Sequence, residues 1–218
     1  MIRSGIRGID GFLGGGLRGG FITDIFGPPA SGKSQIAFEI CAGALAEGGR
    51  VIFHDTSGTL RPERILQILR SRGLGGEGLL DRMIVSRMTN TGEQAAGLSQ
   101  IGPEASLVVV DNATELFSFE YAGRERSLPR NRLLMQYMRR LSGAAVALRV
   151  PVIVTNTVRF IEGGEAENLA SAMRPFPHVR IHLRRMGGVT AAEISTAGKR
   201  SYFSFKITPG GIREGAPA

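Results

Sequence analysis

The sequence predicts an α/β protein: a mostly parallel, twisted sheet flanked by helices, with a β-hairpin at its C-terminal end. Short apolar segments alternate with segments of helical periodicity, which is typical of parallel sheets covered on both faces. The unbroken apolar run at 107–110 indicates a central strand that is buried on both sides. Apolar and basic residues alternate over 179–184, which indicates a strand with one exposed face.

Five strands of the parallel part are expected, and they lie at 21–26, 50–55, 83–85, 107–110 and 151–155. Helices are expected at 33–47, from Pro62 onward, at 92–101 and at 132–148. Two glycines after Glu47 end the first helix, and Pro62 suits the first turn of the second. A turn at 196–199 precedes an apolar segment at 202–205, which predicts the closing hairpin.

The length and composition indicate one globular domain. A chain of 218 residues suffices for one sizeable core, so we expect a single domain over 1–214 and a frayed tail at 215–218. No stretch approaches the roughly 18 apolar residues of a membrane span, so a soluble, cytoplasmic protein is expected. The single cysteine, Cys41, cannot form an internal disulfide, which agrees with a reducing compartment. The net charge of +8 favours a polyanionic partner, although a GC-rich genome would also enrich arginine.

A glycine-rich loop follows the first predicted strand and fits the G-x-x-x-x-G-K-[ST] pattern at every defined position. Such a loop wraps backbone N–H groups around phosphates, and the following helix points its positive end at the same anion. The predicted ligand is ATP or a close relative with Mg²⁺. Lys33 is expected on the β- and γ-phosphates, and the Ser34 hydroxyl on the metal. The predicted nucleotide-binding residues of this segment are Gly27, Pro28, Pro29, Ala30, Ser31, Gly32, Lys33, Ser34 and Gln35.

Asp111 ends the central apolar strand, where a Walker B carboxylate belongs. We expect it to hold Mg²⁺ through water, opposite Ser34. An ordinary aspartate at the end of a strand is the alternative.

Four segments, in order along nearly the whole chain, resemble the core of the RecA/RadA recombinases. Ser4–Gly16 is similar to the entry of that core, and 55–64 is similar to the D-T-E-G-T-F-R-P-E-R segment of archaeal RadA. The stretch 120–124 resembles the E-Y-x-G-R of the same recombinases, and 154–156 their V-T-N. This resemblance implies a RecA-like P-loop NTPase fold. Because the core begins almost at Met1, the short form resembles RadB, the archaeal RadA paralogue.

Two departures from the resembled family bear on catalysis. Ser57 occupies the position of the glutamate that prepares the attacking water, and a hydroxyl cannot act as a carboxylate base. Thr157 replaces the glutamine that senses the γ-phosphate. Slow or negligible hydrolysis is therefore expected, with Glu63 as a weak candidate for a substitute base. The resemblance also places Arg64 along the adenine, and a surface helix charge is the alternative.

Arginines dominate the segment 124–149, where the resemblance places the first DNA loop of the family. The predicted DNA-binding residues are Arg124, Arg126, Arg130 and Arg132, since guanidinium groups pair with phosphates and stack on bases. Seven further cations against Glu193 alone lie between 174 and 206. A solvated basic surface with no specific ligand is the alternative. The loop that matches the second DNA loop carries Glu162, Glu165 and Glu167, which are expected to repel a phosphate backbone.

The predicted function is that of a RadB-like accessory protein of homologous recombination and DNA repair. It would bind ATP and DNA, and the expected form of the DNA is single-stranded. It would also contact a RadA-type recombinase. The chain starts too late to carry the family's phenylalanine-bearing linker, but it could accept that of RadA. A KaiC-type signalling ATPase that does not bind DNA is the first alternative. A small-molecule kinase is the second, for which the sequence offers no lid or acceptor site.

Overall fold

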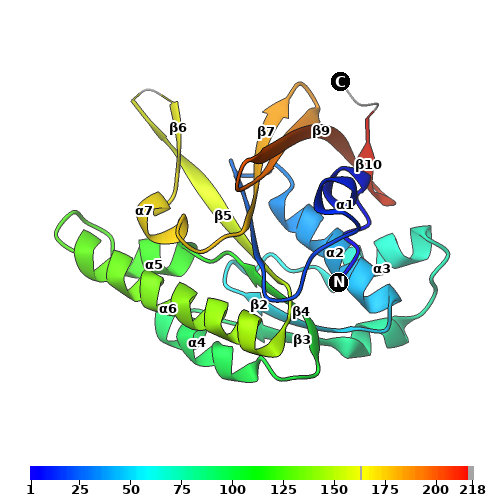
Figure 1. Cartoon of the computed structure of the whole chain (residues 1–218), viewed down its shortest axis with the longest axis horizontal. Coiled ribbons are helices and arrows are strands. Elements are labelled where there is room, and N and C mark those ends of the chain that lie inside the picture. The colour runs from blue at the N-terminus through cyan, green and yellow to red at the C-terminus, as the bar shows by residue number, and fades with distance from the viewer. Residues whose placement is uncertain (163, 216–218) are drawn as a thin grey trace.

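The computed structural model describes residues 1–162 and 164–215, and these build one mixed sheet with helices on both faces (Figure 1). The strand order is β10-β9-β8-β7-β1-β5-β4-β2-β3, and β6 pairs with β5. The strands of the parallel part are β1 Ile22–Gly27, β2 Arg50–Asp55, β3 Met83–Arg87, β4 Ala105–Asp111, β5 Val152–Ile161 and β7 Val179–Met186. The predicted mostly parallel α/β architecture is confirmed.

The C-terminal part of the sheet is an antiparallel meander. It continues from β7 through β8 Val189–Thr196, β9 Lys199–Thr208 and β10 Gly211–Glu214. The predicted turn at 196–199 joins β8 to β9, so the expected hairpin is present. The structure adds a hairpin on each side of it, because 186–189 and 208–211 also reverse the chain.

Helices cover the sheet in two groups (Figure 1). One core packs α1 Arg7–Leu13, α2 Lys33–Ala46 and α3 Pro62–Ser71 against one face. The other packs residues of α5 Glu115–Glu120, α6 Ser127–Leu148 and α7 Ala170–Met173 against the opposite face. The remaining helical segments are α4 Thr91–Ala96 and two 3₁₀ turns, Glu77–Arg82 and Gly97–Gln100. No helix in the described ranges is long and apolar enough to cross a membrane.

Three of the differences from the sequence-based expectation affect the elements around the site. The long helix α6 begins at Ser127, five residues before the predicted start, because Pro129 falls in its first turn, where proline is tolerated. Strand β5 runs to Ile161 and pairs with β6 Gly164–Glu167, so a β-hairpin replaces part of the expected loop. The six-residue helix α5 was not predicted, since its sequence is too short to show a period.

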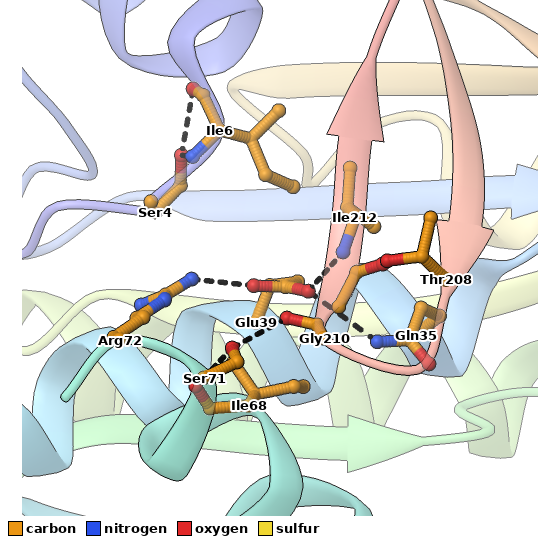
Figure 2. A network of polar contacts seen from close by, with 12 residues as sticks. Ser4, Ile6, Gln35, Glu39, Ile68, Ser71, Arg72, Thr208, Gly210 and Ile212 are labelled. Carbon is orange, nitrogen blue, oxygen red and sulfur yellow. Dashed lines mark hydrogen bonds and ion pairs between the residues drawn. The ribbon is translucent and has the colours of Figure 1, made fainter. Parts of the chain in front are cut away.

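A buried carboxylate ties α2 to the C-terminal meander (Figure 2). Glu39 of α2 accepts hydrogen bonds from the Arg72 guanidinium and from the backbone N–H of Ile212 in β10. Ser71, at the end of α3, donates to the backbone oxygen of Gly210, 2.7 Å away. Burial raises the pKa of Glu39, and the hydrogen bonds and the charge of Arg72 oppose that shift. These contacts fix α2, and with it the loop that precedes this helix, against two neighbouring elements.

Candidate functional site

The glycine-rich loop connects β1 to α2, which is the context the motif requires. Gly32 has a φ of +98°, and a Cβ there would lie 3.3 Å from the Phe205 side chain. A Cβ on Gly27 would lie 2.5 Å from the backbone oxygen of Leu183. Gly27 is therefore required by the close approach of β7, and Gly32 by its left-handed backbone conformation.

Lys33, the first residue of α2, folds its ammonium group over the loop. Its Nζ donates to the backbone oxygens of Gly27, at 3.0 Å, and Pro28, at 2.8 Å. Burial lowers the pKa of Lys33, and the charges of Asp111 and Glu115 oppose that shift. A cation held close to the free N–H groups of a helix start is the charge arrangement that a triphosphate tail requires.

An open cleft of about 560 Å³ lies beside the loop, at the carboxyl ends of the central strands. Four of the predicted nucleotide and metal residues line it: Pro29, Lys33, Ser34 and Asp111. Its other lining residues are Ser57, Thr59, Asn112, Glu115, Ser118, Phe119, Thr157, Arg159 and Asn168. The cleft thus collects side chains from four segments that are far apart in the sequence.

Asp111 lies buried at the base of this cleft. One carboxylate oxygen accepts a hydrogen bond from the Thr155 hydroxyl. The other oxygen, Oδ2, is buried without a hydrogen-bond partner among the described residues. Burial raises the pKa of Asp111, while the hydrogen bond from Thr155 lowers it. A buried oxygen left free beside a hydroxyl and an ammonium group fits a magnesium–nucleotide complex.

Ser57 lies in the cleft wall, and its hydroxyl is 2.7 Å from that of Thr59 and 3.3 Å from the backbone oxygen of Asp111. Thr157 lines the same cleft. The structure therefore brings together the two positions at which the sequence departs from the resembled family. Glu63, the weak candidate for a substitute base, is exposed on the first turn of α3 and is not among the lining residues.

Gln35 and Arg64 hydrogen-bond to each other instead of lining the cleft. Arg64 Nε donates to Gln35 Oε1, at 2.9 Å, and the same guanidinium donates to the backbone oxygens of Thr208 and Pro209. Gln35 also donates to Glu39 (Figure 2). Both side chains therefore support the turn between β9 and β10. Their contact with a nucleotide stays a prediction.

The four predicted DNA-binding residues, Arg124, Arg126, Arg130 and Arg132, form what we call the first basic region. Arg124 and Arg126 are exposed in the turn between α5 and α6, and Arg132 is exposed on α6. Arg130 is half-buried and donates to the backbone oxygen of Tyr121, at 3.3 Å. Three of the four guanidinium groups thus face solvent, and Arg130 also holds the turn.

The second basic region consists of the seven cations Arg174, Arg180, Arg184, Arg185, Lys199, Arg200 and Lys206. Three of them are ion-paired. Glu167 is buried and lies 3.1 Å from Arg174 and 2.5 Å from Arg180, and Arg200 lies 3.0 Å from Glu193. The expectation that Glu167 repels a phosphate backbone is wrong, because two guanidinium groups already neutralise it inside the protein. Glu165 and Glu162 remain exposed.

Glu115, Arg159 and Phe119 were not selected from the sequence, although they line the cleft. A signal for Glu115 was available, because it follows Asp111 by four residues at the carboxyl edge of the sheet. Arg159 belongs to the unexpected outer half of β5. Its position depends on where that strand ends, which local sequence does not specify.

A phosphate loop before a helix, a buried aspartate at the end of the central strand and a mostly parallel sheet define a P-loop nucleotide-binding core. The Rad51 family model matches residues 1–184 of the chain. The chain belongs to the Rad51 family of DNA repair and recombination proteins.

Three relatives illustrate the similarity. DNA repair and recombination protein RadA of Cenarchaeum symbiosum (strain A) is 35% identical over 171 residues, which are 72% of this chain and 42% of that protein. DNA repair protein RAD51 homolog B of Zea mays is 33% identical over 169 residues, 72% of this chain and 50% of that protein. DNA repair protein RAD51 homolog 1 of Arabidopsis thaliana is 33% identical, with 72% and 49% covered. The chain spans about half the length of these relatives, or less.

Proposed function

We propose that the protein is a RadB-like accessory factor of homologous recombination. It binds magnesium–ATP in the cleft beside the phosphate loop, and the nucleotide sets a conformation. It hydrolyses ATP slowly or not at all, binds single-stranded DNA through the first basic region, and modulates a RadA-type recombinase.

The observation that carries this proposal is the joint position of Lys33, Asp111 and Ser57 in one cleft. The ammonium group and the buried carboxylate supply the groups that hold a triphosphate and its metal. The hydroxyl of Ser57 stands where the resembled recombinases have a catalytic glutamate, and it cannot accept a proton from water at neutral pH. Binding without efficient turnover suits an accessory role better than repeated cycles of strand exchange.

The outer edge of β3 supports a contact with a recombinase. β3 is the last strand of the described sheet, so its outer backbone groups have no neighbouring strand. Ile84 and Val85 of this strand are 39% and 45% exposed. An extended segment of another chain could add to such an edge, through backbone hydrogen bonds and apolar contacts. We propose that the linker of a RadA-type recombinase occupies it.

A pull-down with a RadA-type recombinase tests this contact, with and without nucleotide. Val85→Pro removes a backbone donor from the strand and should abolish association if the edge is used. Phe160→Ala, at an exposed aromatic residue of β5, serves as the control. Absence of association in both nucleotide states would count heavily against the recombinase as partner.

Nucleotide binding is tested by calorimetry with ATP and magnesium. The wild-type protein should release heat on binding, and Lys33→Ala should remove it, because the ammonium group lies over the phosphate loop. Ser57→Glu should raise turnover if the rest of the site is intact. Wild-type turnover equal to that of an active recombinase would contradict slow hydrolysis.

Filter binding to oligonucleotides at two salt concentrations separates the proposal from its first alternative. Binding through phosphates should weaken steeply with salt. A protein that hydrolyses ATP or phosphorylates itself, but binds no DNA at either concentration, would instead match the KaiC-type signalling ATPase.

A further inference from the structure

Two carboxylates line the nucleotide cleft within the described residues, Asp111 and Glu115. Asp111 is buried. One of its oxygens accepts a hydrogen bond from the Thr155 hydroxyl, and the other has no hydrogen-bond partner among the described residues. Its place at the base of the cleft suits metal binding. It does not suit proton transfer from a water that attacks from outside.

A third nearby carboxylate, Asp55, is already used by the protein backbone. Its Oδ1 accepts hydrogen bonds from the N–H groups of Gly58, at 2.7 Å, and Thr59, at 3.3 Å. Its Oδ2 accepts from the N–H of Leu60, at 3.4 Å. Asp55 therefore shapes the loop that carries Ser57, and it is not among the residues that line the cleft.

Glu115 differs from both. It is the first residue of α5, and its side chain is exposed within the cleft. No hydrogen bond or ion pair holds its carboxylate in the part of the chain that the structure describes. Its backbone, in contrast, is fixed on both sides. Thr114 donates to the Asn156 side chain at 2.6 Å, and Phe117 is buried in the core.

We propose that Glu115 is the general base for hydrolysis of the bound nucleoside triphosphate, in the role that Ser57 cannot fill. The proposal rests on the ATP site proposed above. It attributes the slow hydrolysis of ATP at that site to Glu115. Glu115 shares one cleft with Lys33 and with Ser57, so a carboxylate on α5 approaches the same space from a different element.

The chemical step is a hydrolysis that needs no further reactant. The water oxygen forms a bond to the γ-phosphorus while its proton moves to the Glu115 carboxylate. The bond from the γ-phosphorus to the bridging oxygen breaks, and the departing nucleoside diphosphate keeps that electron pair. The proton on Glu115 then leaves to solvent through the open side of the cleft.

The charges around Glu115 come from four elements. Burial, followed by the charge of Asp111 on β4, raises its pKa, and Asp55 at the end of β2 adds to the shift. Arg87 of β3 and Lys33 of α2 oppose it. A carboxylate with a raised pKa is a stronger base than an ordinary glutamate, while most of it stays ionised above that pKa.

Steady-state turnover of the full chain with magnesium–ATP tests the assignment. Glu115→Gln should lower kcat by about 10²-fold, the usual range for loss of a general base. The affinity for magnesium–ATP, measured by calorimetry, should stay equal or become tighter, because a negative charge near the phosphates is removed. Glu47→Gln, which removes an exposed carboxylate at the far end of α2, is the matched control and should match wild type in both measurements.

The pH profile provides a readout that a purely structural role would not change. In the wild-type protein kcat should rise with pH as Glu115 loses its proton, and Glu115→Gln should abolish that rise. Glu115→Asp should restore part of the turnover. Glu63→Gln should leave turnover unchanged, since that carboxylate lies outside the cleft.

Several outcomes would overturn the assignment while leaving nucleotide binding intact. These are equal turnover in wild type and Glu115→Gln, a loss of turnover in Glu63→Gln instead, or wild-type turnover no higher than that of Lys33→Ala despite measurable binding. A parallel loss of ATP affinity and turnover in Glu115→Gln would make the residue a binding group. Absence of any heat of binding in the wild-type protein would instead refute the ATP site itself.

Discussion

The two basic regions look alike in the sequence and differ in the structure. In the first, Arg124, Arg126 and Arg132 are exposed around the start of α6. In the second, Arg174 and Arg180 pair with the buried Glu167, and Arg200 pairs with Glu193. Two clusters of positive charge therefore serve different purposes. The first region leaves Arg124, Arg126 and Arg132 without an ion pair among the described residues, whereas the second uses part of its charge to hold the β5–β6 hairpin to β7.

Arg180→Ala should have the largest effect, and the effect should be on stability. Arg180 lies against Glu167, which is almost completely buried, and its guanidinium lies 4.3 Å from the centre of the Phe26 ring. Arg180 also lies 3.9 Å from the fully buried Asp24. Its removal takes the neighbouring cation from Asp24 and leaves Glu167 with Arg174 alone, and loss of a cation from buried carboxylates costs about 3 kcal/mol. Urea denaturation should show this loss in the free energy of unfolding.

Arg184→Ala is the matched control for that prediction. Arg184 lies on the same strand, but it is exposed and its guanidinium has no ion pair in the described ranges. Its removal should change the free energy of unfolding by less than about 0.5 kcal/mol, as is usual for surface positions. Equal losses in the two variants would mean that Arg180 is no more structural than its neighbour.

Removing Arg124, Arg126 and Arg132 together should have the next largest effect, this time on DNA binding. Replacement of all three by alanine should weaken binding to a single-stranded oligonucleotide on the order of tenfold or more. The slope of log affinity against log salt should fall by about 0.7 for each phosphate that the variant no longer neutralises. Filter binding over a range of salt concentrations measures both quantities.

The control for the DNA measurement removes the same charge elsewhere. Arg3, Arg18 and Arg213 are exposed and lie outside both basic regions. Their replacement by alanine lowers the net charge equally and should leave most of the affinity in place. Comparable losses in both triple variants would show that total charge, and not the first basic region, binds the DNA.

The sequence predicts the parallel sheet and the phosphate loop well because both depend on local patterns. A continuous apolar run indicates a buried strand, and a fixed glycine spacing indicates the backbone conformation of the phosphate loop. The β5–β6 hairpin was missed for the opposite reason. From the sequence, Glu165 and Glu167 are expected to be exposed acidic residues of a loop. Tertiary structure alone brings Arg174 and Arg180 next to Glu167.

The candidate site was predictable where residues are adjacent in sequence and not where the fold assembles them. Lys33, Ser34 and Asp111 line the cleft as expected. The resemblance predicts that Arg64 lies along the adenine. Its guanidinium instead hydrogen-bonds to the turn between β9 and β10, a contact between residues about 145 positions apart. Hydrogen bonds between residues so far apart in the sequence depend on tertiary packing, and no local sequence pattern predicts them.

His182 provides a pH-dependent test of the hairpin contact in the second basic region. Its Nε2 lies 3.7 Å from Glu165, and its ring stacks on Phe26. Burial and the charge of Arg184 lower the pKa of His182 despite Glu165. The unfolded chain therefore binds a proton more readily than the folded one, so stability is lost as the pH falls below about 6.5.

Comparing the wild type with His182→Gln by urea denaturation from pH 7.5 to 5 isolates this contribution. The variant should lose less stability over that range. His54, whose pKa burial lowers to about 4, acts in the same direction in both proteins and cancels in the difference. A steeper pH dependence in the variant would mean that Glu165 outweighs burial and that His182 is charged in the folded protein.

Glu193→Gln should have the smallest effect. The variant tests how strongly a surface ion pair prevents its arginine from binding DNA. Arg200 pairs with Glu193, but its side chain is 62% exposed. Surface pairs are worth about 0 to 1 kcal/mol, so the free energy of unfolding should change by less than that. Freed from its partner, Arg200 should raise DNA affinity by no more than about twofold at low salt, because only a weak interaction held it back. A tenfold gain would show that the second basic region is a DNA site masked by its own acids, and the contrast between the two regions would then be one of degree.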